Sequence, residues 1–493
     1  MKILNSLKIC VILIAIVFVL SSCDSGSNGD NALPIFNESN EDLLEMEDLG
    51  FLGQSAIFLD YDGDNDQDLL FTTIDIRKRD IFFFENRDSK FYFLPGNRKI
   101  SNELVRSLTV ADCDNDNDLD LALGTIESQQ PFILYKNNEN NFVASSEESG
   151  ITEPGTVLHV IWGDFNSDGN IDIFQGNMGK NLLYINSGDC VFNSIDFVTG
   201  QESIRTNSIN ATDIDNDNDP DLILANNSRN QLLRNDGNNV FVDISETAGI
   251  QGREKSSSKA VCSGDYNNDG FLDLYIVNSD RIGNKLYKNN GDATFTDVTD
   301  SAGAKDVGDG RTCSFLDFDG DGLLDIFSTN HLSPNKMYKN LGNGKFEDVA
   351  KEIGLTEPLD IFSATWGDYN NDGFLDVFLN GHIGKALFKN SGNKNNSIII
   401  KLIGNGSTTN SSAIGSKVTL NSTNGSQIRE VSGGKGCCEQ DMLPVHFGVG
   451  KEKNADINVQ WTDGTSCGFK NVNVKNNTFV SINQADCKLV KIK

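Results

Sequence analysis

The stretch Asp265-Tyr266-Asn267-Asn268-Asp269-Gly270-Phe271-Leu272-Asp273 decides the fold, because it is one of seven copies of a nine-residue pattern, D-x-[DN]-x-D-[GN]-x-x-D. The copies begin at Asp60, Asp112, Asp164, Asp213, Asp265, Asp317 and Asp368. Successive copies are 52, 52, 49, 52, 52 and 51 residues apart. Such even spacing indicates an array of equivalent structural units.

The sequence around each copy predicts four short β-strands. One apolar run leads into the loop, as at 56–59, and another leaves it, as at 273–277. A third run carries an aromatic residue and a turn, as at 286–291, and a fourth follows at 294–299. Four strands in about 50 residues are typical of one propeller blade. We therefore expect an all-β fold with a seven-bladed β-propeller over residues 34–392. A linear β-solenoid is the alternative, although its repeats are normally shorter.

The two ends of the array predict a closed ring. The seventh repeat reaches 387–390 and then lacks its fourth strand, whereas residues 34–39 near the start resemble that missing strand. We expect the N-terminal segment to complete the last blade. Closure would remove the two unpaired sheet edges that an open array leaves.

The loops have the chemistry of calcium sites, because positions 1, 3, 5 and 9 all bear side-chain oxygens. These residues are Asp60, Asp62, Asp64 and Asp68; Asp112, Asp114, Asp116 and Asp120; Asp164, Asn166, Asp168 and Asp172; Asp213, Asp215, Asp217 and Asp221; Asp265, Asn267, Asp269 and Asp273; Asp317, Asp319, Asp321 and Asp325; and Asp368, Asn370, Asp372 and Asp376. Calcium takes six to eight oxygen ligands, and Gly or Asn at position 6 permits the sharp turn around the ion.

Electrostatics favours the same interpretation, since like charges ~4 Å apart repel by ~1 to ~4 kcal/mol per pair. We expect up to seven Ca²⁺ ions, all on one rim of the ring. The alternative is seven ion-free hairpin turns, which would explain the turn residues but not the acids at four fixed positions.

The N-terminus predicts export. Lys2 and Lys8 precede an apolar run, 9–20, that is shorter than the roughly 20 residues a membrane span requires. The run ends in Leu20-Ser21-Ser22-Cys23, which resembles the bacterial lipobox. The resemblance implies a signal peptide over 1–22 and a lipid on Cys23; an ordinary signal with an incidental cysteine is the alternative.

Residues 23–33 are polar and rich in Gly and Ser, and we expect them to form a flexible tether. The protein would then be exported and anchored to the bacterial cell envelope, at the outer membrane or cell surface, touching the membrane only through its lipid. Nucleic acid is excluded as a partner, because 71 acidic against 41 basic residues give a charge of −30 and phosphate binding needs basic patches.

Besides the predicted lipid site Cys23, eight cysteines remain in the exported chain, in two groups. Cys113, Cys190, Cys262 and Cys313 lie in the repeats, and Cys437, Cys438, Cys467 and Cys487 lie near the C-terminus. Export makes disulfides possible, but the spacing leaves their pairing open.

The repeat stops at Asn393, and residues 393–493 predict a separate small β-domain. Short β-like runs separated by Gly-rich turns occur at 397–402, 416–420 and 456–461.

Both regions resemble known families. The loops resemble the calcium loops of FG-GAP (VCBS-type) repeats, known from integrin α-subunit propellers. The segments 414–418, 429–436, 446–450 and 459–464 resemble the ASPIC/UnbV domain, which follows a VCBS propeller in the cartilage acidic protein family and its bacterial relatives. The pair Cys437-Cys438 departs from that pattern, since the family usually has an aromatic and a small residue there.

The sequence favours a non-catalytic binding or adhesion module with a protein or glycan ligand. His159, His331, His382 and His446 lie in no recognised catalytic spacing, and calcium ligation accounts for the paired acids. We expect the opposite face and the central channel of the propeller to be left for a partner. A carbohydrate-active or other hydrolytic propeller enzyme is the alternative.

Overall fold

The computed structural model describes residues 33–44, 52–73, 81–94, 104–126, 131–195, 197, 205–254, 257–279, 281–357, 360–382 and 384–493. Contacts divide the chain into two units, Leu33–Lys493 and Met1–Ala32, and the second of these lies outside the described residues. The predicted signal peptide, Cys23 and the tether up to Ala32 therefore also lie outside them. In the described part of the chain, no helix is long and apolar enough to cross a membrane.

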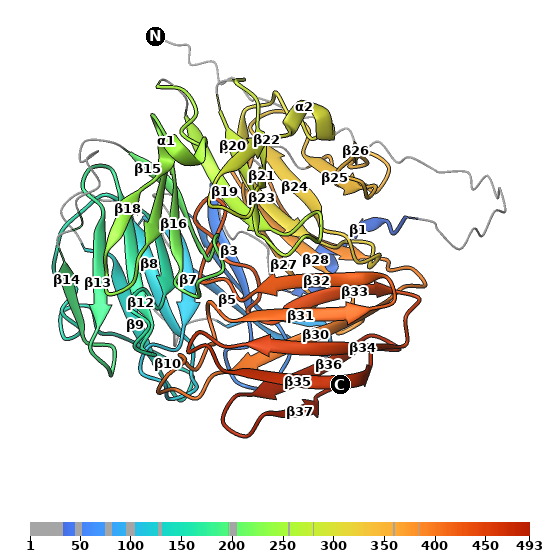
Figure 1. Ribbon diagram of the computed structural model, residues 1–493. Helices are drawn as coiled ribbons and strands as arrows, with labels where there is room; N and C mark the ends of the chain where they lie inside the picture. Colours follow the sequence, from blue (N-terminus) through green and yellow to red (C-terminus); the bar gives the residue numbers. More distant parts are fainter. Residues whose placement is uncertain are drawn as a thin grey trace, which may run out of the picture. The chain divides into compact units, whose positions relative to one another are not determined.

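Among the described residues, 36–390 form seven sheets built on one plan (Figure 1). The first strands are β3 (Gly53–Leu59), β7 (Val105–Ala111), β11 (Val157–Gly163), β15 (Thr206–Thr212), β19 (Ser258–Gly264), β23 (Gly310–Leu316) and β27 (Ile361–Gly367). The second strands are β4 (Asp68–Thr73), β8 (Asp120–Thr125), β12 (Asp172–Asn177), β16 (Asp221–Asn226), β20 (Asp273–Asn278), β24 (Asp325–Asn330) and β28 (Asp376–Gly381). Each predicted loop joins a first strand to a second strand, as the pairing of Gly264 with Asp273 shows.

The outer half of each sheet repeats in the same way. The third strands are β5 (Ile81–Arg87), β9 (Ile133–Asn138), β13 (Leu182–Asn186), β17 (Gln231–Asn235), β21 (Lys285–Asn289), β25 (Lys336–Asn340) and β29 (Lys385–Asn390). The outermost strands are β6 (Lys90–Phe93), β10 (Asn141–Ala144), β14 (Phe192–Ile195), β18 (Phe241–Asp243), β22 (Phe295–Asp297), β26 (Phe346–Asp348) and β1 (Phe36–Glu38). Short additions are η1 (Asn40–Asp42), β2 (Leu43–Leu44) beside β6, α1 (Ser245–Ala248) and α2 (Thr299–Ala302).

The first strands form a closed circuit. Each packs against the first strand of the next sheet, from β3 through to β27, and β27 packs against β3. The sheets are therefore arranged as in a propeller, with their first strands around a common axis.

The predicted ring closure is confirmed. Strand β1 pairs antiparallel with β29, with Phe36 opposite Asn390 and Glu38 opposite Phe388. The Phe36 ring is buried and meets the Trp366 ring edge-on at 5.9 Å. The N-terminal strand thus supplies both the missing ladder and a core side chain for the last sheet.

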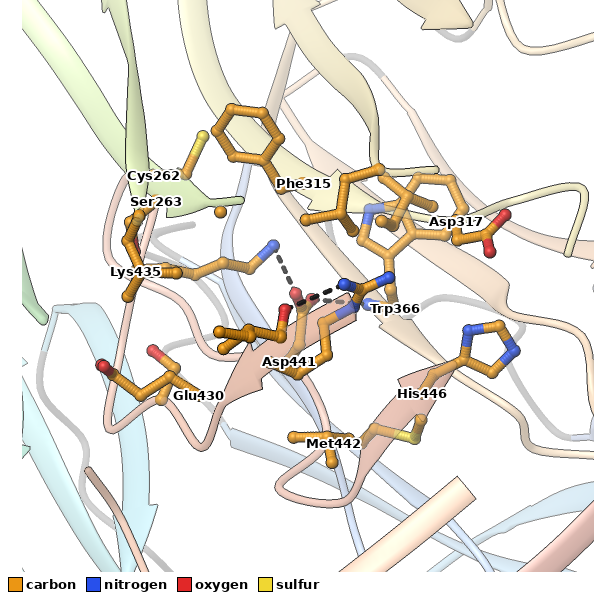
Figure 2. A pocket seen from close by; sticks show the side chains of 18 of the residues that line it. Cys262, Ser263, Phe315, Asp317, Trp366, Glu430, Lys435, Asp441, Met442 and His446 are labelled. Carbon is orange, nitrogen blue, oxygen red and sulfur yellow. Dashed lines mark hydrogen bonds and ion pairs between the residues drawn. The ribbon is translucent and has the colours of Figure 1, made fainter. Parts of the chain in front are cut away.

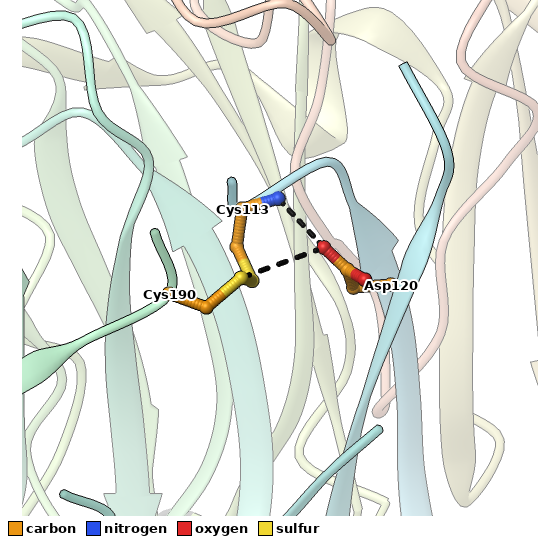
Figure 3. Close-up of side chains that lie close together, drawn as sticks. All are labelled: Cys113, Asp120 and Cys190. Atoms are coloured by element: carbon orange, nitrogen blue, oxygen red, sulfur yellow. Dashed lines mark hydrogen bonds between the residues drawn. A yellow bond between two sulfur atoms is a disulfide. The ribbon is translucent and has the colours of Figure 1, made fainter. Parts of the chain in front are cut away.

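Three disulfides settle the pairing that the sequence left open. They join Cys113 to Cys190, Cys262 to Cys313, and Cys467 to Cys487. The first two link neighbouring sheets, and Figure 3 shows Cys113–Cys190 beside Asp120, whose carboxylate accepts a hydrogen bond from the Cys113 amide. Cys437 and Cys438 are buried free thiols.

The C-terminal region forms two four-stranded sheets, ordered β33-β30-β36-β37 and β32-β31-β34-β35. The strands are β30 (Asn396–Ile403), β31 (Lys417–Ser422), β32 (Gly425–Glu430), β33 (Val445–Gly450), β34 (Asn454–Gln460), β35 (Ser466–Asn473), β36 (Thr478–Asn483) and β37 (Lys488–Lys491). Their apolar side chains share one buried cluster with the second and third sheets, in which Ile414 and Trp461 lie with Trp162. The C-terminal sheets are therefore packed onto the repeats through a common core.

The expectation that the central channel is left for a partner is wrong. Residues 432–443, here called the channel segment, connect β32 to β33 and pass inside the ring of first strands. The segment forms hydrogen bonds with Ser55 of β3, Leu108 of β7, Trp162 of β11, Ser208 of β15, Val261 of β19, Thr312 of β23 and Ala364 of β27. One loop thus contacts the first strand of all seven described sheets.

Glycine makes this insertion possible. A Cβ on Gly433 would lie 2.1 Å from the Trp162 carbonyl oxygen, and Gly434 has a φ of +146°. A cavity of about 150 Å³ with a mixed polar and apolar lining remains between the segment and the wall. Figure 2 shows Lys435 and Asp441 pointing toward each other there, with Lys435 Nζ 2.7 Å from Asp441 Oδ2.

Candidate calcium loops

The first Asp of each loop fixes the shape of the loop. Asp265 accepts hydrogen bonds from the amides of Asp269 (3.0 Å) and Gly270 (2.9 Å), and Gly270 has the predicted positive φ of +93°. Asp112, Asp164, Asp213, Asp317 and Asp368 accept the equivalent pair of bonds in their own loops. The backbone therefore curls around one point in each of these loops.

The predicted ligand side chains converge in four of the loops. Oxygens lying within 4.8 Å of one another come from Asp60, Asp62 and Asp64; Asp112, Asp114 and Asp120; Asp213, Asp215 and Asp221; and Asp317, Asp319 and Asp325. The other three loops carry Asn at position 3, and the amide oxygens of Asn166, Asn267 and Asn370 accept a hydrogen bond from the amide of position 5. Asp319 makes the same bond, so Asn presents its oxygen in place of a carboxylate.

Burial disfavours the ionised form of these loop carboxyl groups when no cation is bound. Burial, together with the charges of the neighbouring loop acids, raises the pKa of Asp68 to about 9 and that of Asp221 and Asp273 to about 8. Buried oxygens of Asp60, Asp114, Asp215 and Asp273 have no hydrogen-bond partner among the described residues. A bound divalent cation would satisfy these oxygens and favour the ionised forms, so the donor set fits calcium.

The ninth Asp of each loop anchors an Asn of its own sheet, and in six of the described sheets that Asn bridges to a neighbouring loop. Asp273 accepts a hydrogen bond from the Asn289 amide (2.7 Å) at the end of β21. The Asn289 side chain in turn donates to the carbonyls of Leu272 in its own loop (3.1 Å) and Ile214 in the preceding loop (2.8 Å). Equivalent bridges to the preceding loop start from Asn186, Asn235, Asn340 and Asn390, and Asn86 bridges to Tyr369 of the last loop.

Sequence reasoning missed these asparagines, although the signal is visible. An Asn ends or nearly ends every third strand. From the sequence alone, this Asn is expected only to form part of the turn that follows the third strand. The bridging hydrogen bonds of this Asn depend on which loop lies beside it in the folded protein, and the sequence does not show that neighbour.

The C-terminal sheets cover the rim that carries the loops. Ser411 and Ser412 bond Asp112, Gly450 donates its amide to the Gly320 carbonyl, and Ser397 donates to the Gly373 carbonyl. The rim therefore faces a domain of the same chain.

Two loops receive a cation from that domain. Lys401 Nζ lies 3.0 Å from Asp60 Oδ2, and Lys417 Nζ lies 2.7 Å from Asp213 Oδ2. The Lys417–Asp213 pair is almost completely buried. These lysines compete with a metal ion at the first Asp of the first and fourth loops.

The four histidines lie in three places: His159 and His446 are each buried separately, and His331 and His382 lie together beside Asp360. His159 and His446 are buried, and burial lowers the pKa of His159 to about 3 and that of His446 to about 4. His331 and His382 both lie beside the buried carboxylate of Asp360. Since Arg311 lies 3.9 Å from the same carboxylate, Asp360 is held in an ion-pair cluster.

Together, the fold and the loops define an all-β, propeller-like repeat protein with acidic loops on one rim. FG-GAP-like repeats match residues 112–175, 164–224, 213–276, 265–328 and 317–379, which together span more than half of the chain. The ASPIC and UnbV family matches residues 406–488. The chain therefore belongs to the FG-GAP-like repeat family and carries a C-terminal ASPIC and UnbV domain.

Curated relatives agree with that assignment. Cartilage acidic protein 1 from Homo sapiens is 27% identical over 289 residues, covering 45% of this chain and 43% of that protein. The Xenopus tropicalis protein of the same name is 32% identical over 142 residues, covering 28% of this chain and 22% of that protein. The matches thus span less than half the length of these relatives.

Two solved structures are also similar. One is titled for recognition of non-reducing terminal N-acetylglucosamine by an Agrocybe aegerita lectin (TM-score 0.43, 16% identity, 70% of this chain and 90% of that chain). The other is titled YCF48 bound to D1 peptide (TM-score 0.46, 7% identity, 73% and 96%). At these TM-scores the likenesses carry no functional argument.

Proposed function

We propose that this protein is a calcium-binding, non-catalytic binding module, exported and anchored to the bacterial cell envelope through a lipid on Cys23. Its parts would be a signal peptide (1–22), a tether (23–33), a seven-bladed propeller (34–392) and an ASPIC/UnbV-like β-domain (393–493). The observation that carries the proposal is the set of seven acidic loops, six of which are curled around one point by hydrogen bonds to their first Asp. Family membership supports the same function.

Calcium in this proposal is structural. Each loop ties a first strand to a second strand, and its ninth Asp is bonded to the bridging Asn, so the ion would stabilise the strand ends and the contacts between blades. Loops whose ligand acids already pair with a lysine would bind calcium more weakly than loops without such a pair. Lys401 pairs with Asp60, Lys417 with Asp213, and Lys339 with both Asp319 and Asp321. Up to seven ions remain the proposed total.

The partner-binding surface lies away from the loops and outside the filled channel. The C-terminal sheets cover the loop rim and the channel segment fills the ring, so neither offers space to a partner. We place the ligand, a protein or a glycan, on the opposite face or on the outer blade edges.

The test is a glycan and protein array screen with the purified exported chain, run beside a hydrolase substrate panel. We expect saturable binding of at least one protein or glycan on the array and no turnover of any substrate on the panel. Turnover of a glycan or ester that is lost when Asp309 or Asp360, acids outside the loops, is replaced by Asn would overturn it in favour of a hydrolytic enzyme.

A further inference from the structure

One position of the repeat places basic side chains on the face opposite the calcium loops. Six residues before the first Asp of each loop, the seven repeats carry Gln54, Arg106, Leu158, Asn207, Lys259, Arg311 and Phe362. These residues lie at the start of the first strands, at the end of the ring away from the loops, and are here called the far ring. Three of the seven are cations.

A fourth cation joins them. Arg205 precedes β15 and donates from Nε to the Asn207 side-chain oxygen at 2.8 Å. Its pKa is lowered by burial and by the charge of Arg106. The pKa of Lys259 is likewise lowered by burial and by the charges of Arg205, Arg311 and Arg106, an effect that the charge of Cys437 opposes. Arg106 and Asn207, the residue that Arg205 contacts, both lie against Cys438, so these cations surround one point of the ring.

Three of these cations lack an acidic partner among the described residues. Arg311 is paired with Asp309 at 3.8 Å and with Asp360 at 3.9 Å. For Arg106, Arg205 and Lys259, no described carboxylate lies within ion-pair distance. This is unusual in a chain with 71 acidic and 41 basic residues, where acids are the commoner neighbour.

The tip of the channel segment lies directly behind the far ring. Arg106 donates from Nε to Cys438 Sγ at 3.3 Å and from Nη2 to Cys437 Sγ at 3.5 Å. The two sulfurs are 3.4 Å apart. Hydrogen bonding from Cys438 and the positive charge of Arg106 lower the pKa of Cys437, whereas burial raises it. Arg106 is therefore bonded to two sulfur atoms and to no described carboxylate.

We propose that the far ring is an oxyanion-binding site, in which Arg106, Arg205 and Lys259 hold a carboxylate, sulfate or phosphate group. Guanidinium groups match the paired oxygens of such groups, and partly buried cations bind them more strongly than exposed ones. The inference rests on the proposed binding role and supplies the ligand chemistry for the face opposite the loops. An acidic saccharide or an inorganic anion would carry the same group.

The experiment measures binding of sulfate, phosphate and glucuronate to the calcium-loaded exported chain by titration calorimetry. At least one anion should bind saturably, and binding should weaken as sodium chloride is raised. Lys259→Gln and Arg205→Gln should each weaken that binding about tenfold, since each removes one charged partner. Lys470→Gln, at a lysine whose side chain is 84% exposed in the C-terminal sheets, is the matched control and should bind like the parent.

The three anions distinguish an acidic saccharide from an inorganic ligand, and the controls distinguish the far-ring site from the proposed binding function. Tighter binding of glucuronate than of sulfate and phosphate identifies an acidic saccharide, and the reverse identifies an inorganic anion. No saturable binding of any of the three anions, or binding unchanged in both far-ring variants, would overturn the inference. A chain that takes up calcium and finds an array partner, yet binds none of these anions, would refute the far-ring site alone.

Discussion

Replacement of Glu439 probes how firmly the channel segment is seated in the ring. The side chain is fully buried, and its carboxylate accepts hydrogen bonds from the Ala364 amide (2.6 Å) and the Thr312 hydroxyl. Glu439→Ala leaves both donors buried and unpaired, at ~1 to ~3 kcal/mol each. We expect the free energy of unfolding to fall by about 2 to 6 kcal/mol.

Glu439→Gln is the matched control and adds a pH signature. Burial raises the pKa of Glu439 from 4.5 to about 7, an effect that the charge of Lys435 opposes. The native state therefore keeps a proton that the unfolded chain loses above pH 4.5, so the parent protein loses stability as pH rises from 4.5 to 7. At 1.36 kcal/mol per unit this amounts to about 3 kcal/mol, which the Gln variant should not lose.

The assay is urea unfolding at saturating calcium, followed by tryptophan fluorescence, at pH 5 and pH 7. Calcium-loop acids titrate in all three proteins, so differences between variants isolate Glu439. An Ala variant within ~0.5 kcal/mol of the parent would refute the reasoning, because surface substitutions have effects of that size. Identical pH dependence in the parent and the Gln variant would refute the pKa argument.

The remaining predictions concern the anchor, the ring and the loops. Cys23→Ser should abolish fatty-acid labelling and leave unprocessed precursor, and unchanged labelling would exclude lipidation there. Deletion of 34–40 removes β1 from the last sheet and should cause aggregation or a large fall in melting temperature, whereas a deletion that melts like the parent would contradict the closure. Asn289→Ala unpairs two buried carbonyls and should cost about 2 to 4 kcal/mol in urea unfolding, while Asn290→Ala at the adjacent exposed position should be nearly neutral. Asp269→Ala should lower the melting temperature in calcium but not in chelator, and an equal loss in both would mean that Asp269 holds no ion.

The sequence predicted those parts of the fold that repeat. The loop pattern, its spacing and the alternation of short apolar runs identified the four-strand unit, and the lack of a fourth strand after Asn390 identified β1 as its replacement. Gly270 illustrates why this worked, since its left-handed turn is a local requirement that the residue type itself reveals.

The features that the sequence did not predict depend on contacts between distant segments. The Gly433-Gly434 pair and the residues around it look like an ordinary Gly-rich turn, and only the ring of first strands shows that this turn fills the channel. Lys417 is likewise an unremarkable strand residue until it meets Asp213, about 200 positions away in sequence. The bridging asparagines follow the ninth Asp at separations from 14 to 18 residues, so their recurrence is less regular than that of the loops.

The most direct test of the central claim is a count of bound calcium. The exported chain, stripped with chelator and dialysed against buffered calcium, is analysed for metal by mass spectrometry, and its melting temperature is measured with and without the ion. We expect several and at most seven calcium ions per chain and a higher melting temperature in calcium. The ions should be lost first from loops whose acids pair with a lysine, such as those that contact Lys401, Lys417 and Lys339. A chain that retains no calcium and melts at the same temperature in chelator would contradict it.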